Sequence, residues 1–350
     1  MKKYILPPCV NWYRANMHCH STISDGSLTP EEIKEAYKKE GYSVVAYTDH
    51  EILLDHSDLD DDSFLTLTSS EYSITEAVAS VPSATGSRGN NPWSRKKTIH
   101  LCIYSKDQHN EFQPGADDDS FRWVQNGIHT SKGKCDGYHR EYTRESINET
   151  IKRLNDSGFL VQYNHPNWSL NDREDYINLK GIWSLEILNY ATQLLTGAEY
   201  CPYIYDDMFR SGMNSLYCSM GDDNHNRDKS LAQSFGGSTF IGAKELKYDQ
   251  IFSALERGEF YCASGKNPPR IKSLYVEDNV IKIDCTEATN IILTGYGRNW
   301  RNISGNGITH AELPLKLNDV YFRITVRDAY GNSAHTHYYK VKDFYEEIKQ

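Results

Sequence analysis

Short apolar runs alternate with amphipathic, helix-like stretches between Asn16 and about Tyr261. The segment TPEE, which starts at Thr29, has a capping-box pattern with proline in the first turn, and Gly41 closes the helix that it predicts. An apolar strand over 43–47 follows directly. This alternation is typical of parallel β/α units rather than of a β-sandwich.

The same alternation predicts the other elements of this part of the chain. Helices are expected at 143–156 and 249–257, and strands at 159–163, 182–188, 215–220 and 239–241. Loops are expected at 58–63, 82–97 and 107–140. The last stretch is too long for a plain connection, so it either caps or lines a site or forms a surface excursion.

The pattern changes beyond the segment GKNPP at 265–269, where strands follow one another without helices. Strands are expected at 271–276, 280–285, 291–294, 320–326 and 337–341. The chain is therefore predicted to contain an α/β domain over 1–269 and a small all-β domain over 270–350, which ends in a short helix.

Composition narrows the classes of partner. A formal net charge of -10 over 350 residues argues against a surface that binds long nucleic acid through its phosphates. We expect neither a signal peptide nor a membrane-spanning run. Eight scattered cysteines without CxxC spacing favour reduced, mostly buried thiols in a cytoplasmic protein. An anionic substrate would then need a local positive centre, for which bound metal ions are the obvious candidate.

The segment HCHSTISDG, which starts at His18, places metal-capable side chains where a strand runs into a loop. Side chains two residues apart on a strand point the same way, so His18 and His20 can hold one ion. An HxH pair alone is more often two ordinary strand histidines. The chain contains such a pair at His335 and His337, which we expect to be surface or cross-strand histidines without acidic partners.

Other candidate ligands recur near the ends of successive predicted strands. The set comprises His18, His20, Asp25, His50, Glu71, His100, His165, Asp223 and His225. The carboxyl ends of parallel strands meet on one rim, so these side chains are expected to converge there. His100 is the exception, because it lies near the start of its strand.

These segments resemble the PHP family of polymerase and histidinol phosphatase metallo-phosphoesterases. The matching segments are HCHSTISDG, TDH at 48–50, Glu71, His100, NHP at 164–166 and GDDNH at 221–225. The resemblance covers roughly residues 14–265 and implies a distorted seven-stranded β/α barrel with a trinuclear metal centre. It implies one ion on His18, His20, Glu71 and Asp223, a second on Glu71, His100 and His165, and a third on Asp25, His50 and His225.

The sequence departs from the family pattern at two places. Asp222 precedes Asp223 where a small residue is usual, and the DxH spacing favours Asp223 as the ligand. The segment 107–140 carries no motif of the family, so the substrate pocket is left undefined. Imidazole and carboxylate ligands without cysteine suit manganese, iron or zinc better than magnesium or calcium. Three divalent ions would outweigh the three carboxylates and favour a phosphate dianion.

The predicted function is hydrolysis of a phosphomonoester, a nucleotide or other small phosphate ester, through a metal-bridging hydroxide. Asp49 is expected to orient a metal ligand, and Arg140, Arg144 and Arg227 are candidates to clamp phosphate. An arginine at such a position is more often an ordinary surface residue.

Three alternatives remain. An exonuclease or oligonucleotidase acting on the end of a short single strand would use the same ligands. An amidohydrolase-type barrel also begins with HxH, but it expects a carbamylated lysine, and no lysine stands among these ligands. A noncatalytic metal-binding module is the rival from another class.

Overall fold

The computed structural model describes residues 2–81, 93–112 and 137–346. Its contacts divide the chain into two compact units. We call residues 15–235 the α/β unit, and residues 1–14 with 236–350 the β-rich unit. The domain boundary between residues 269 and 270 stays a prediction from the sequence.

Strands of the α/β unit belong to two open sheets. The first contributes the parallel strands β2 (Asn11–Asn16), of which residues 15 and 16 lie in this unit, β3 (Val44–Ala46) and β4 (Leu65–Leu67). The second has the order β5 (Ser69–Thr75), β6 (Thr98–Ser105), β7 (Phe159–Tyr163), β8 (Ser184–Asn189) and β9 (Tyr217–Gly221). Isolated bridges connect the two sheets at His50–Glu71 and Cys19–Asn224. A mixed α/β architecture is therefore confirmed, whereas a closed seven-stranded barrel is not, because neither sheet closes within the described residues.

One strand runs against the predicted parallel arrangement. β6 pairs antiparallel with both β5 and β7, while β7, β8 and β9 are parallel. The connection from β5 to β6 contains only the 3-10 turn η2 (Trp93–Arg95) within its described residues. A parallel crossover normally needs a helix-length connection, so an antiparallel return is the simpler path.

The helices of the α/β unit form where the sequence supplies caps and apolar stripes. α1 (Pro30–Lys39) begins with the predicted capping box of Thr29 and Glu32, and it buries Ile33 and Tyr37. α2 (Arg144–Asp156) is capped by Thr143. Three further helices were not predicted: α3 (Arg173–Tyr176), α4 (Tyr190–Thr196) and α5 (Pro202–Arg210). The described residues contain no helix that is long and apolar enough to cross a membrane.

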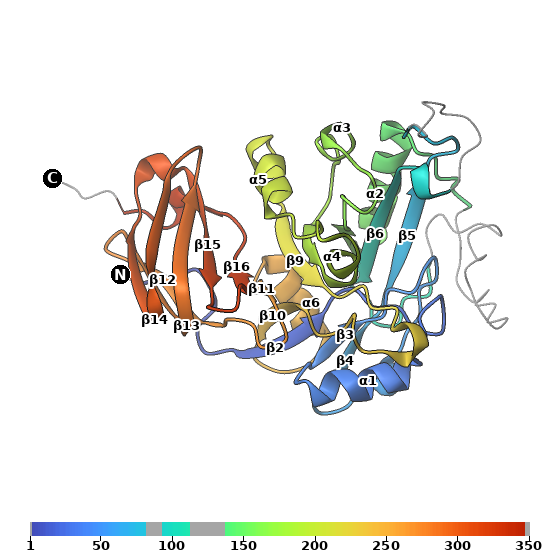
Figure 1. The fold of residues 1–350 in the computed structure, drawn as a ribbon, viewed down its shortest axis with the longest axis horizontal. Helices are drawn as coiled ribbons and strands as arrows, with labels where there is room; N and C mark the ends of the chain where they lie inside the picture. The colour runs from blue at the N-terminus through green and yellow to red at the C-terminus, as the bar shows by residue number, and fades with distance from the viewer. Residues whose placement is uncertain (1, 82–92, 113–136, 347–350) are drawn as a thin grey trace. The chain divides into compact units, whose positions relative to one another are not determined.

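The β-rich unit is built around an antiparallel sheet. Its strands are β1 (Lys3–Tyr4), β10 (Gly237–Ala243), β11 (Phe260–Ser264), β12 (Ile271–Glu277), β13 (Val280–Gly295), β14 (Trp300–Pro314), β15 (Tyr321–Arg327), β16 (Ser333–His335) and β17 (Tyr339–Lys340). The order is β1-β12-β13-β15-β16-β11-β10, with β14 on β13 and β17 on β15 (Figure 1). Helix α6 (Tyr248–Arg257) connects β10 to β11, as predicted.

Alternating apolar side chains of these strands fill a core of their own. It includes Leu274, Ile283, Ile291, Ile324 and Val326, all buried. The two strands predicted at 280–285 and 291–294 are a single long strand, β13. The described part of the C-terminus forms the 3-10 turn η7 (Val341–Asp343), and residues 347–350 of the predicted C-terminal helix lie outside the described residues.

Candidate metal centre

The segments that follow β2 and β9 hold each other in register. The amide of Asp223 donates to the carbonyl of His18 at 2.8 Å, and the amide of His20 donates to the carbonyl of Asn224 at 3.2 Å. Gly221 permits this approach, since a Cβ there would lie 2.8 Å from the Cβ of His18. The backbone thereby brings Asp223 beside both histidines of the HCH segment.

A tight loop returns Asp25 to the same place. The amide of Gly26 donates to the carbonyl of Ser21 at 2.9 Å, and a Cβ at Gly26 would lie only 2.4 Å from the carbonyl oxygen of His20. Asp49 fastens this loop, because its carboxylate accepts the amide and hydroxyl of both Ser21 and Ser24 at 2.7–3.1 Å. Asp49 thus contacts the loop between two candidate ligands rather than an imidazole ring.

Glu71 lies at the centre of the cluster. Its Oε1 lies 3.3 Å from His18 Nε2, 3.1 Å from His100 Nδ1 and 3.2 Å from His165 Nε2. Its Oε2 lies 3.3 Å from His20 Nε2 and 3.2 Å from His50 Nδ1. Five imidazoles therefore surround one carboxylate that is 1% exposed.

Asp223 provides the test of whether these residues fit a metal ion. Its buried Oδ1 lies 3.3 Å from His18 Nε2 and 3.0 Å from His20 Nε2, yet it forms no hydrogen bond with any described residue. The two Nε2 atoms are 3.2 Å apart. Neighbouring donor atoms around a cation with bonds of about 2.0–2.2 Å are separated by roughly 2.8–3.6 Å, from octahedral to tetrahedral geometry. The cluster has the spacing that a shared cation would impose.

Two of these residues also have unusual backbone conformations. Asp223 has φ 53° and His165 has φ 23°, both in the left-handed region that non-glycine residues rarely adopt. Such strain persists where the surrounding structure enforces it, and it is concentrated at functional sites.

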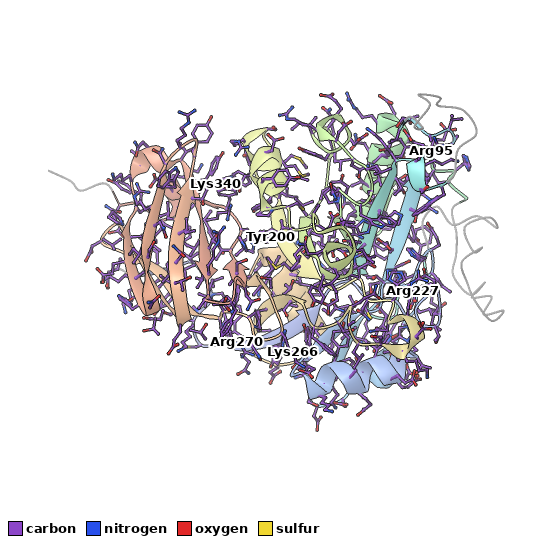
Figure 2. All side chains as sticks on the ribbon, viewed as in Figure 1. Arg95, Tyr200, Arg227, Lys266, Arg270 and Lys340 are labelled. Carbon is purple, nitrogen blue, oxygen red and sulfur yellow. The ribbon has the colours of Figure 1, made fainter. Side chains whose placement is uncertain are left out.

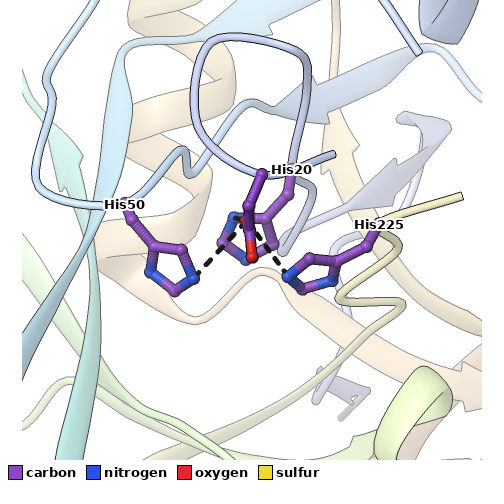
Figure 3. Close-up of side chains that lie close together, drawn as sticks. His20, His50 and His225 are labelled. Carbon is purple, nitrogen blue, oxygen red and sulfur yellow. Dashed lines mark ion pairs between the residues drawn. The ribbon is translucent and has the colours of Figure 1, made fainter. Parts of the chain in front are cut away.

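The nine predicted residues come together in three overlapping groups. The groups are His18, His20, Glu71 and Asp223; Glu71, His100 and His165; and His20, Asp25, His50 and His225. Within each group the potential ligand atoms lie within 4.8 Å of one another. The first two match the sets that the family resemblance implies, and the third adds His20. Figure 3 shows His20, His50 and His225 converging. A ring nitrogen of each lies 3.3–3.9 Å from Oδ1 of Asp25.

Carboxylates and imidazoles in the cluster shift each other's pKa values. Burial alone would raise the pKa of Glu71, but His18 and His100 outweigh it and hold the pKa well below its usual range. Burial would lower the pKa of His18, but Asp223 and other anionic neighbours raise it well above 6.5. For His50, burial and the adjacent His20 lower the pKa to about 3. In the absence of cations, protons on some imidazoles therefore balance the buried carboxylates, and a metal ion would replace those protons.

Polar residues behind the candidate ligands hold both their imidazoles and their carboxylates, and the sequence did not predict them. Glu186, fully buried in β8, lies 3.1 Å from His18 Nδ1. Asn189 donates to Asp223 Oδ2 at 3.1 Å, and Asn164 donates to Glu71 Oε1 at 2.8 Å. Ser169 Oγ lies 3.0 Å from His165 Nδ1. A carboxylate inside the apolar run SLEILN was the available signal for Glu186, although it lies within a strand rather than at its end.

The cluster forms part of the wall of a pocket of about 370 Å³. Candidate ligands line it together with Ser73, Thr75, Trp93, Trp168, Ala191, Thr192, Leu195, Arg227 and Gln233. Of the predicted phosphate-binding arginines, Arg227 lines the pocket at the start of η5 (Arg227–Lys229) (Figure 2). Arg140 donates to Glu51 at 2.6 Å and lies over the ring of Tyr72. Arg144 is exposed at the start of α2 and is not among the lining residues.

The loop predictions at 82–97 and 107–140 fall partly on residues 82–92 and 113–136, which lie outside the described residues. The prediction of buried thiols is confirmed for most of the described cysteines. Six of them are buried and only Cys9 is exposed, with no disulfide among them; Cys135 lies in the 113–136 gap.

Comparison with known proteins gives structural similarities alone. No protein-family model matches the sequence, and no curated protein matches it. The chain is similar to a two-domain protein from Bacteroides vulgatus that contains a predicted PHP-like metal-dependent phosphoesterase, with 13% identity, 97% coverage of both chains and a TM-score of 0.46. It is also similar to a protein from Bifidobacterium adolescentis, provisionally described as a metal-dependent phosphoesterase, with 17% identity, coverage of 60% of this chain and 87% of that chain, and a TM-score of 0.37. An amidohydrolase from Chromobacterium violaceum with bound sulfate has 16% identity, coverage of 70% and 96%, and a TM-score of 0.40.

Proposed function

We propose that the chain is a metal-dependent phosphoesterase of the PHP family that hydrolyses a small phosphomonoester. The observation that carries this proposal is the overlap of three histidine and carboxylate groups around Glu71 on the wall of one pocket. The two sheets that meet at the His50–Glu71 and Cys19–Asn224 bridges would then be the two arcs of a distorted barrel.

Three divalent ions, manganese, iron or zinc, fit these groups. When bound, such ions lower the pKa of water towards neutrality and neutralise the charge of a phosphate ester. His18, His20, Glu71 and Asp223 would hold one ion; Glu71, His100 and His165 a second; and Asp25, His50 and His225, with His20 nearby, a third.

The surrounding residues fix which nitrogen each imidazole presents. Glu186 accepts from His18 Nδ1, and Ser169 contacts His165 Nδ1, so both rings turn Nε2 toward Glu71. The Nδ1 atom of His225 donates to the carbonyl of Asp223 at 2.9 Å, which leaves its Nε2 for Asp25. Such partners set the tautomer and orientation of metal-binding histidines.

Arg227 is the candidate for binding the phosphate. It is exposed, it lines the pocket, and among the described residues its side chain has no ion-pair partner. A planar guanidinium can bind two phosphate oxygens at once. Arg140 is less suited to this task, because its guanidinium already pairs with Glu51. Asp49 supports the site indirectly by fastening the loop that carries Asp25.

The size of the pocket and the charge of the chain favour a small substrate. A volume of about 370 Å³ lies at the small end of ligand sites. A net charge of -10 provides no basic track for a long nucleic acid. Hydrolysis of a small phosphomonoester is therefore favoured, and an exonuclease or oligonucleotidase acting on the end of a short single strand is the alternative.

The test is turnover of a panel of phosphomonoesters, bisphosphorylated nucleotides and short single-stranded oligonucleotides by the purified chain loaded with Mn²⁺. We expect release of inorganic phosphate from a monoester, loss of activity in Asp223→Asn, and a several-fold rise in KM in Arg227→Ala. Arg257→Ala, which removes an arginine paired with Glu259 in the β-rich unit, is the control. An inert wild-type protein with full metal content would contradict the proposal and favour a noncatalytic binding module. Full metal content and activity in Asp223→Asn would contradict the ligand assignment.

A further inference from the structure

Two tryptophans form a wall that starts at the candidate metal ligands and extends outward. The ring of Trp168 lies 5.1 Å from the ring of His165 and 5.5 Å from that of His100. The ring of Trp93 lies 5.3 Å from that of Trp168, tilted by 56°. Trp93 and Trp168 both line the pocket. We call these two residues the tryptophan wall.

The outer part of this wall faces solvent. Trp93 is 51% exposed, and Leu195, another lining residue, is 72% exposed. Large apolar side chains left open beside a polar cluster are typical of ligand sites. Within the described part of the chain, the ring of Trp93 contacts that of Trp168 and no ring of a candidate ligand. A change at Trp93 therefore does not remove a direct contact of the metal cluster.

The inner part of the wall is fixed by a buried carboxylate. Glu199, fully buried, accepts the amide of Trp168 at 2.7 Å and the amide of Asn167 at 3.1 Å. These two bonds hold the turn that follows His165. The indole of Trp168 is thus positioned together with a candidate ligand, and its distance from the reacting phosphate is set by the fold.

The charge and polarity of the residues that line the pocket indicate which organic group the substrate carries. Apart from the candidate ligands, Arg227 is the only charged residue among the described lining residues, and the phosphate would occupy it. The faces of the two indoles offer no hydrogen-bonding group to the hydroxyls of a polyol, which would find partners only at the other polar lining residues, Ser73, Thr75, Thr192 and Gln233. A planar ring stacks on an indole without needing a specific hydrogen bond.

We propose that the tryptophan wall is a specificity element that binds a planar ring in the organic part of the phosphate ester, an aryl group or a nucleobase. This inference rests on the proposed phosphoesterase function and deepens it. Trp93 is the residue that can be tested separately, because Trp168 also contacts His100 and His165.

Pairs of matched substrates measure the contribution of the planar ring to binding and turnover. In a nucleoside 5′-monophosphate and in ribose 5-phosphate the leaving atom is the primary 5′-oxygen of a ribose, and the two esters differ in the base. Benzyl phosphate and cyclohexylmethyl phosphate differ in the planarity of the ring and distinguish an aryl from a nucleobase preference. The wild-type protein with Mn²⁺ should prefer the planar member of at least one pair by about tenfold in kcat/KM, expressed mainly in KM, as expected for stacking on an aromatic side chain.

Variants of Trp93 test the assignment. Trp93→Ala should reduce the preference ratio to near one, and Trp93→Phe should retain most of it. Trp300→Ala, which removes a 68% exposed tryptophan of β14, should leave the ratio unchanged. Phosphatase activity without a planar preference, or a preference that Trp93→Ala does not change, would overturn the inference while the proposed function stands.

Failure of the proposed function is a separate outcome. If the metal-loaded protein hydrolyses none of the esters, calorimetric binding of the nucleoside 5′-monophosphate and of ribose 5-phosphate replaces turnover as the readout. Tighter binding of the nucleotide that is lost in Trp93→Ala would support the tryptophan wall as a ring-binding surface. Equal binding of the two ligands, or no binding, would overturn it.

Discussion

The chain contains two histidine pairs with the same spacing and nearly the same burial, in two different units. His18 and His20 follow β2 in the α/β unit, and both are fully buried. His335, the last residue of β16, and His337 are 2% and 1% exposed in the β-rich unit. The prediction that the second pair consists of surface histidines is therefore wrong. The alternative prediction, a cross-strand position, is confirmed for His335, which pairs with Thr325 and Cys262 on the neighbouring strands.

The neighbours of the two pairs have opposite charges. Carboxylates of Glu71, Asp223 and Glu186 approach His18 to 3.1–3.3 Å, and they raise its pKa against the effect of burial. Burial, together with Arg323 and Arg327, lowers the pKa of His335 well below 6.5. The capacity to attract a cation thus comes from the carboxylates that the fold brings to the first pair, not from the HxH spacing.

Removing the charge of the carboxylate shared by the candidate ligands, Glu71, should have the largest effect on activity. Glu71→Gln keeps the shape of the side chain but removes the charge that five imidazoles surround. We expect phosphatase activity to fall by more than about a hundredfold, beyond the loss typical of residues that only support ligands. Steady-state kinetics and metal content measure this loss. Glu277→Gln, in the β-rich unit, is the control, and equal activity of both variants would contradict the central role of Glu71.

Removing the supporting carboxylate should have an intermediate effect. Glu186 contacts the far nitrogen of His18, so Glu186→Gln leaves the three candidate ligand groups intact. A loss of about 10–100-fold in metal affinity is expected, because the ring loses the anion that orients it and increases its basicity. Competition with a chelator of known affinity measures the change. Unchanged affinity would show that His18 is held by packing alone.

His335 of the second pair is expected to affect the pH dependence of stability rather than metal binding. His335 has a depressed pKa in the folded chain, so the unfolded chain binds a proton first as the pH falls below about 6.5. This one residue should then remove about 1.4 kcal/mol of stability per pH unit until its folded pKa is reached. Urea unfolding at pH 7.5 and 5.5 should show a steeper loss in the wild-type protein than in His335→Gln. Parallel pH dependence of the two proteins would mean that His335 is not buried in its neutral form.

Elements with strong local signals were predictable. The capping box of Thr29 and Glu32 and the glycine at 41 fixed α1 to within a residue or so of its observed bounds. The convergence of the candidate ligands at strand ends was predictable, because the ends of parallel strands meet on one rim and the strand before each candidate is apolar. The exposed strand β14 was missed for the opposite reason, since most of its side chains face solvent and it has no apolar run.

The positions of His100 and Glu186 in the fold depend on strand pairing that the sequence pattern does not predict. His100 lies near the start of β6, whereas the other candidate ligands were expected at the ends of strands. Because β6 is antiparallel to β5 and β7, its start lies beside Ser73 of β5 and Asn164 after β7. Strand direction depends on long-range pairing, which a local pattern does not encode. Glu186 belongs to the interior of β8, so its contact with His18, 168 positions earlier in the chain, required the fold. The tryptophan wall likewise joins residues from separate loops.

The most direct test of the account is the metal content of matched variants, measured by elemental mass spectrometry on folded, Mn²⁺-loaded protein. His18→Gln with His20→Gln should lose bound metal relative to the wild-type protein, for which we predict three ions per chain. His335→Gln with His337→Gln should retain all three. Wild-type metal content in the first double variant, or loss of metal in the second, would contradict the claim that the carboxylates around His18 and His20 create the metal centre.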